Sequence, residues 1–114
     1  MARIIKPEQA AHLEGHCGNV IRLLAGGQNP ANFDVVKITT AQEHMHKIST
    51  EYYYVLKGEG RLVLGARMYL IKAGYLIEIR PNTWHKAIAE QTGLELLVVG
   101  VPPLMPEDTY FKTK

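Results

Sequence analysis

The sequence predicts an all-β fold, an antiparallel sandwich or barrel, and three observations support this. Apolar runs rich in Val, Ile, Leu and Tyr recur along the chain, and all of them are short. Gly, Pro and Asn stand between the runs, as they do between strands. The connections are also short, which favours antiparallel pairing of successive strands.

The expected elements follow one another closely in a chain of 114 residues. First comes a short helical turn within 7–13, because Pro7 stands at an allowed starting position and Gly15 lies just past its end. The apolar runs predict strands at 20–24, 33–38, 52–56, 62–64, 68–71, 75–79 and 94–101. The turns between them are predicted at 26–27, 57–60, 72–74, 80–82 and 90–93.

We expect a single domain, because its length is near the size at which one core becomes sufficient. Its expected parts are a barrel core at about 20–101, an N-terminal arm at 1–19 and a C-terminal tail at 102–114, within the domain 1–114. Three prolines keep the tail from being a central strand. We expect it to wrap the barrel or pack on a partner, anchored by Tyr110 and Phe111.

Many of the predicted strands are apolar on both faces, unlike strands that have one face in water. One face fills the barrel interior. The apolar residues on the other face predict a homodimer, because monomers rarely expose apolar sheet faces. Tyr52 and Tyr54 are expected on this outer side, for packing or for an interface.

Composition and charge narrow the class of protein. The formal net charge is +2 without a long run of Lys or Arg, so we expect no nucleic-acid partner. Cys17 is the only cysteine, which excludes an intrachain disulfide and favours a reducing compartment. Neither a signal peptide nor an apolar stretch of about 20 residues is present, so we expect a cytoplasmic protein without a membrane partner.

A cluster of metal-binding residue types follows the second predicted strand. His44 and His46 project to the same side of a strand, because side chains alternate along it. Glu51 opens the next strand, antiparallel to the first, where its carboxylate can return beside the imidazoles. An HxH pair alone is usually a surface feature. However, His85 follows a later strand and a Pro-Asn turn, and a second hairpin could bring it across the barrel to form a divalent metal site.

These residues resemble the two sequence motifs of the cupin superfamily. The first motif, HxH, three or four residues, Glu, six residues, Gly, is matched by His44, His46, Glu51 and Gly58. The second, Gly, five residues, Pro-x-Gly, two residues, His, is matched from Gly74 to His85 with Arg80-Pro81-Asn82 in the middle. Asn82 can replace the last glycine, since Asn adopts positive φ more readily than other residues. The resemblance covers about residues 20–101 and implies a double-stranded β-helix, or jelly-roll barrel.

By this resemblance, one divalent ion (Mn, Fe, Ni, Co, Cu or Zn) would be bound inside the barrel by His44, His46, Glu51 and His85. Octahedral metals would keep two positions free for water or substrate. Small cupins include isomerases, lyases, decarboxylases, dioxygenases and proteins that only bind a ligand. The resemblance therefore implies a metalloenzyme acting on a sugar, a sugar acid or a keto or hydroxy acid. The alternative is a non-catalytic small-molecule-binding or regulatory module with a structural or incidental metal.

Three further residues are candidates for contact with a substrate. Tyr53 shares strand parity with Glu51, so its phenol could reach the cavity as a hydrogen-bond donor or an acid, or pack in the core. Arg61 would clamp an anionic substrate if it points inward, and would otherwise be an exposed strand residue. Trp84 would line the mouth or pack at a barrel end.

His12, His16 and Cys17 form the only competing cluster of metal-binding residue types in the sequence. On a helical turn, His12 and His16 would share a face at positions i and i+4. Because no fourth ligand accompanies them, we interpret the two histidines as a surface pair.

Overall fold

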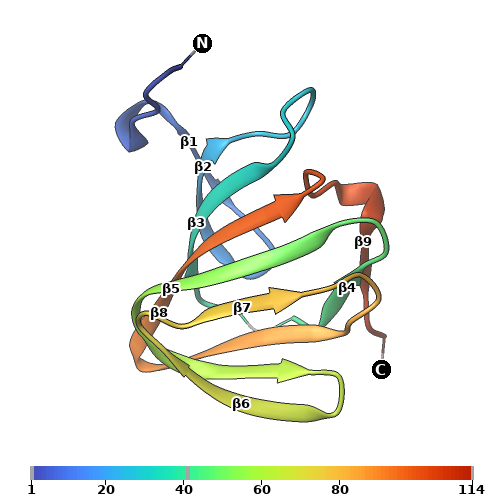
Figure 1. Ribbon diagram of the computed structural model, residues 1–114. Helices are drawn as coiled ribbons and strands as arrows, with labels where there is room; N and C mark the ends of the chain where they lie inside the picture. Colours follow the sequence, from blue (N-terminus) through green and yellow to red (C-terminus); the bar gives the residue numbers. More distant parts are fainter. Residues whose placement is uncertain (1, 41, 114) are drawn as a thin grey trace.

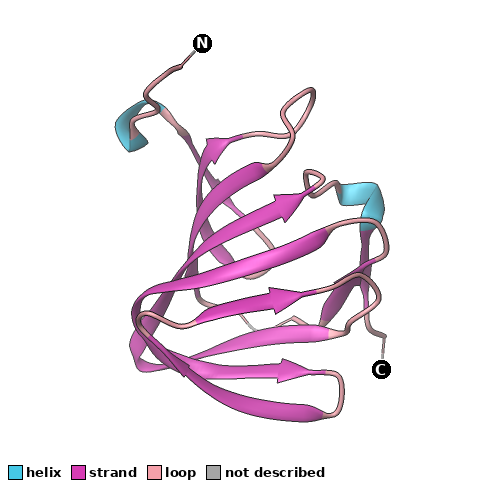
Figure 2. Ribbon diagram, viewed as in Figure 1, coloured by secondary structure: helices cyan, strands magenta, loops and turns pink. Residues whose placement is uncertain are grey.

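The structure, a computed structural model, describes residues 2–40 and 42–113. In this part of the chain nearly all regular structure is antiparallel strand, which confirms the all-β prediction (Figure 2). The elements are η1 (Pro7–Gln9), β1 (Ala11–Glu14), β2 (Gly18–Leu24), β3 (Asn32–Ile38), β4 (His44–His46), β5 (Thr50–Leu64), β6 (Arg67–Lys72), β7 (Leu76–Ile79), β8 (His85–Val101), η2 (Pro106–Asp108) and β9 (Thr109–Phe111).

The strands form one curled sheet in the order β1-β2-β3-β8-β4-β9, and β5 pairs with β6, β7 and β8 (Figure 1). The C-terminal strand β9 lies beside β4, with Met45 opposite Tyr110. The C-terminal residues thus pack on the chain's own sheet. Both helices within the described residues are only three residues long, and neither can span a bilayer.

The strand β5 is longer than the sequence predicts. The expected strands at 52–56 and 62–64 are parts of β5, so the turn predicted at 57–60 is wrong. Gly58 has a φ of 78°, and the pairing with β8 shifts its register on both sides of it. A Cβ atom at Gly58 would collide with the backbone oxygen of Gly93. The glycine therefore marks a bulge that bends a continuous strand around the barrel.

The strand β8 is likewise longer than predicted. It runs from His85 to Val101, so the turn predicted at 90–93 is also wrong. Gly93, with a φ of 87°, lies within it opposite the bulge in β5. Gly58 and Gly93 were both predicted in turns, but each lies where the long strand pair β5 and β8 bends.

The N-terminal helical turn predicted within 7–13 is only partly present. Residues Pro7–Gln9 form a 3₁₀ turn, but Ala11–Glu14 is strand β1, in which His12 pairs with Ile21 of β2. A helix this short is marginal in isolation, whereas pairing with β2 satisfies the extended backbone. His12 and His16 therefore do not share a helical face, although both residues are exposed.

The core lies between the walls of the curled sheet. Side chains alternate along β5, so that Tyr53 and Val55 are buried while Tyr54 is exposed on the other side. The same alternation buries Leu96 and Val98 of β8. The inward-facing residues of β3, β5 and β8 thus line the space in which the candidate site lies.

Candidate metal centre

The structure brings His44, His46, Glu51 and His85 together, as expected. His44 and His46 project from β4 to one side, and His44 pairs across the sheet with His85, the first residue of β8. Glu51 comes from the start of β5. The expected pairing of its strand with that of the two histidines is not found in the described residues, where β4 pairs with β8 and β9. Curling of the sheet, rather than a hairpin, brings the carboxylate to the imidazoles.

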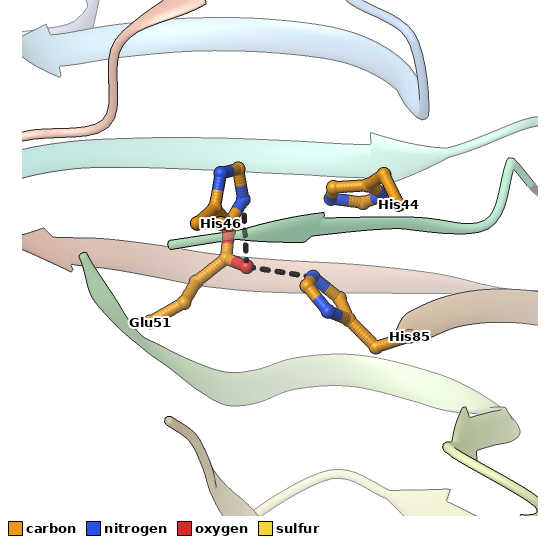
Figure 3. A group of neighbouring side chains, drawn as sticks. All are labelled: His44, His46, Glu51 and His85. Atoms are coloured by element: carbon orange, nitrogen blue, oxygen red, sulfur yellow. Dashed lines mark hydrogen bonds and ion pairs between the residues drawn. The ribbon is translucent and has the colours of Figure 1, made fainter. Parts of the chain in front are cut away.

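The four side chains are buried and close together. Their exposed fractions are between 0% and 4%, and one ligand atom from each lies within 4.8 Å of the others. Figure 3 shows His46 and His85 directed at the Glu51 carboxylate, with His44 beside them. These residues could hold a metal ion.

Hydrogen bonds to backbone carbonyls fix the tautomer of all three imidazoles. The Nδ1 atom of His44 donates to the Gln42 oxygen (2.9 Å), and that of His85 to the Thr83 oxygen (2.8 Å). The Nδ1 atom of His46 donates to the Asp108 oxygen (3.1 Å). A neutral ring that carries its proton on Nδ1 has a lone pair on Nε2. Each of the three Nε2 atoms therefore has a lone pair with which it could bind a cation.

The Glu51 carboxylate lies between two of these rings. Its Oε1 atom is 2.9 Å from Nε2 of His85 and 3.5 Å from Nε2 of His46. Burial raises the pKa of Glu51, but the adjacent His46 and His85 rings outweigh this and lower it to about 2. The carboxylate is thus ionised at neutral pH, and a buried anion needs a positive partner.

These donor atoms fit a divalent metal ion. The Nε2 atom of His46 is buried and has no hydrogen-bond partner among the described residues. Lone pairs on neutral rings cannot donate to the ionised Glu51, so only extra protons or a cation would make these contacts favourable. Three imidazoles and one carboxylate are suitable ligands for Mn, Fe, Co, Ni, Cu or Zn. Burial also lowers the pKa of His44 to about 4, which keeps its ring neutral and available.

Two backbone contacts hold the first histidine pair in place. The N–H of Asn82 donates to the His46 oxygen (2.7 Å), which joins the two motifs. Asn82 has a φ of 68°, so its predicted role as a substitute for glycine is confirmed. The Asp108 carboxylate accepts hydrogen bonds from the backbone of residues 47–49. Nothing local in the sequence marks Asp108, because its partners lie about sixty residues earlier.

A cavity of about 290 Å³ lies against the centre, and His44, His46, Glu51 and Tyr53 all line it. Tyr53 is 4% exposed, with its ring centroid 6.2 Å from that of His85. Burial, followed by the charge of Glu51, raises the pKa of Tyr53 well above its ordinary value. Its phenol therefore keeps its proton and can donate a hydrogen bond into the cavity.

The other two predicted contact residues lie elsewhere. Within the described part of the chain, neither Arg61 nor Trp84 is among the residues that line this cavity. Arg61 is paired with Glu90 (3.0 Å) and is 40% exposed. The Lys112 ammonium group lies over the Trp84 ring, with Nζ 5.6 Å from the ring centroid.

His16 and Cys17 reach the cavity from the turn between β1 and β2, which the sequence did not indicate. The Nε2 atom of His16 is 3.4 Å from that of His44, and His16, Cys17 and His44 form a second group that could hold a metal. His12 instead contacts the Pro7 oxygen (3.3 Å). Burial raises the pKa of Cys17 to about 12, so the thiol stays protonated.

Comparison with known proteins gives one family and one sequence relative. Residues 33–100 match the protein family described as Cupin domain. The uncharacterized protein MJ1618 of Methanocaldococcus jannaschii is 39% identical over 69 residues, or 58% of this chain and 54% of that protein. The match thus spans about half of the relative's length.

Several solved structures share the fold. Streptomyces PAC13 with uridine has a TM-score of 0.85 and 21% identity over 99% of this chain and 92% of that chain. Pac13 is described as a nucleoside dehydratase. FeII HppE has a TM-score of 0.72 and 18% identity over 86% of this chain and 60% of that chain. At these identities the likeness shows the fold alone.

Proposed function

Because this chain belongs to the cupin domain family, we propose that it is a metal-dependent enzyme acting on a small oxygenated molecule. The substrate would be a sugar, a sugar acid or a keto or hydroxy acid. One observation carries the proposal: three imidazole lone pairs and an ionised, buried carboxylate converge beside a cavity of about 290 Å³. His44, His46, Glu51 and His85 would hold the ion, which would be Mn, Fe, Ni, Co, Cu or Zn.

A divalent ion bound there would supply a Lewis acid for chemistry of the isomerase, lyase, decarboxylase or dioxygenase type. The chain's own residues supply the surroundings. Val36, Leu96 and Val98 make part of the cavity wall apolar, which limits water around a bound substrate. Tyr53 is the proposed catalytic contact, because its protonated phenol can donate a hydrogen bond to a developing oxyanion.

We also propose a homodimer, with the outer face of the large sheet as its interface. The register places Leu76, Tyr54, Leu97, Val35 and Ile21 in one row across β7, β5, β8, β3 and β2. Leu76 is 67% exposed and Tyr54 is 42% exposed. Such a continuous apolar row is what a second copy of this sheet could cover. A cytoplasmic location is proposed on the single cysteine, which suits a reducing compartment.

A non-catalytic binding module is the second candidate, and one observation favours it. Apart from the histidines, Glu51 and the ion pair of Arg22 with Asp34, the titratable groups on the cavity wall are Cys17 and Tyr53. Both have raised pKa values and hold their protons at neutral pH. Among the described residues this leaves His16, whose pKa is lowered by burial, as the one imidazole on the wall outside the ligand set. With so few groups to exchange protons, the cavity could bind a molecule and leave it unchanged.

A turnover screen separates the two functions. Protein loaded separately with each of the six metals would be incubated with sugars, sugar acids, keto acids and hydroxy acids. Uridine would be included because it accompanies PAC13. Product detection by NMR with the wild type and with His12→Ala, but not with His44→Ala, supports the enzyme. Saturable binding without any product in every metal form would favour the binding module instead.

A further inference from the structure

A hydrogen-bonded network of polar side chains lies on the cavity wall formed by β2 and β3. The Nε atom of Arg22 donates to one carboxylate oxygen of Asp34 (3.1 Å), and Nδ2 of Asn32 donates to the other (3.1 Å). Asn32 in turn accepts a hydrogen bond from the backbone N–H of Leu104 (2.8 Å). Asp34 is 5% exposed and Asn32 is 3% exposed, so this network is anchored in the protein interior.

This arrangement holds the Arg22 guanidinium in place and leaves part of it unused. Arg22 and Asp34 both line the cavity, and the Arg22 side chain is 43% exposed. Within the described residues its hydrogen bond to a side chain is made through Nε, which leaves the two terminal amino groups for another partner. A guanidinium that is oriented by one carboxylate can bind a second anion bidentately.

Protein stability alone is a weak explanation for this network of polar side chains. An ion pair with one partner this exposed contributes little, while burying Asp34 and Asn32 carries a desolvation cost. Arg22 is also the only Arg or Lys among the described residues that line the cavity. A single oriented positive charge on the wall of a substrate-sized cavity suits recognition of an anion.

We infer that Arg22 forms an anion subsite, which binds a carboxylate or phosphate group of a small organic substrate. This inference rests on the proposed function in that it assigns the other end of the substrate to the four candidate metal ligands. Arg22 lines the cavity from β2 and Glu51 lines it from β5, and these strands are separated by β3 and β8. The anionic group would therefore lie at the end of the substrate remote from its reacting oxygen, and a cavity of about 290 Å³ limits the substrate to a small acid.

Three matched probes test the subsite: glycerate, glycerol 3-phosphate and glycerol. Their dissociation constants would be measured by calorimetry on the wild type, Arg22→Gln and Arg22→Lys. The double variant Arg22→Gln/Asp34→Asn removes the ion pair without leaving a buried carboxylate unpaired. Arg80→Gln is the control, because Arg80 is 79% exposed and pairs with Glu78 outside the cavity. Metal content and circular dichroism would be recorded for each sample.

We expect the wild type and Arg80→Gln to bind at least one anion about 10- to 100-fold tighter than glycerol, as for a charged hydrogen-bonded pair. Arg22→Gln and the double variant would lose this preference with metal content unchanged, and Arg22→Lys would retain part of it. A preference for glycerate alone identifies a carboxylate, and one for glycerol 3-phosphate alone identifies a phosphate. The inference is overturned if the wild type shows no anion preference or if the folded double variant keeps it. A different outcome would contradict the proposed function instead: the wild type contains no metal, yet it binds anions tighter than glycerol and loses this preference in Arg22→Gln.

Discussion

The Nδ1 atom of His46 lies 3.1 Å from the backbone oxygen of Asp108, a residue 62 positions further along the chain. The carboxylate of the same Asp108 accepts hydrogen bonds of 3.0 to 3.3 Å from the backbone N–H groups of residues 47–49. One residue of the C-terminal turn η2 therefore orients an imidazole of the candidate centre. It also holds the loop that leads from β4 to Glu51.

Substitution of Asp108 tests this contact through protein stability. Burial raises the pKa of Asp108, but the three backbone donors outweigh it and hold the pKa below the ordinary 3.8. A carboxylate with a depressed pKa stabilises the fold above its unfolded value and loses that effect as the pH falls through the folded value. We expect Asp108→Asn to cost about 1–3 kcal/mol in metal-free protein at pH 7, and less at pH 3, which lies below the ordinary pKa of 3.8.

Urea unfolding at the two pH values measures this difference. Glu107→Gln is the control, since Glu107 is the exposed neighbour in η2. An Asp108→Asn cost that is equally large at both pH values would show that the ionised carboxylate is not what the loop depends on.

Metal removal should lower the thermal stability of the wild type. Glu51→Gln keeps the size of the side chain but removes the buried negative charge, so it should bind the ion poorly. A ligand at 100 to 1,000 times its dissociation constant stabilises by about 3–4 kcal/mol, or roughly 10 °C or more in a domain of this size. We expect a chelator to lower the melting temperature of the wild type and of Glu90→Gln by this amount, and to leave Glu51→Gln nearly unchanged. An equal shift in Glu51→Gln would place the stabilising metal elsewhere.

Cys17 should be unreactive in the folded protein. Burial, with the charge of Glu51 as a second cause, raises its pKa to about 12, so about one thiol in ten thousand is ionised at pH 8. We expect slow reaction with a disulfide reagent at pH 8 and rapid reaction in concentrated urea. Rapid modification of the native protein would mean that the turn between β1 and β2 opens and exposes the cavity.

The outer sheet face should control association. Leu76→Asp places a charge in the apolar row that we propose as the interface, at a position that is 67% exposed in one copy. We expect this variant to sediment as a monomer with a melting temperature near that of the dissociated wild type. Leu70→Asp is the matched control, because Leu70 is 77% exposed on β6, outside the row. A monomeric wild type, or a dimeric Leu76→Asp, would contradict the proposed interface.

The parts of the site that sequence could predict are those with fixed local spacing. The alternation of a strand put His44 and His46 on one side, and the motif spacing added Glu51 and His85. The role of Asn82 in place of the motif's glycine could be predicted because a positive φ restricts the residue types that fit there. Each of these inferences needed only a few neighbouring residues.

The remaining contacts depend on how distant segments meet. His16 approaches His44 only because β1 pairs with β2 and turns over the cavity. Arg22 faces inward through its pairing with Asp34 across two strands. Gly58 looked like a turn because a glycine in a bulge and a glycine in a turn carry the same local signal. Only the tertiary arrangement distinguishes these cases.

The central claim is that His44, His46, Glu51 and His85 bind one divalent metal ion. The most direct test is elemental mass spectrometry of protein purified without an affinity tag, beside His44→Ala and the control His12→Ala. We expect nearly one equivalent of a transition metal in the wild type and in His12→Ala, and less than about a tenth of that in His44→Ala. Equal metal content in the wild type and His44→Ala, or none in the wild type even after reloading, would contradict the account.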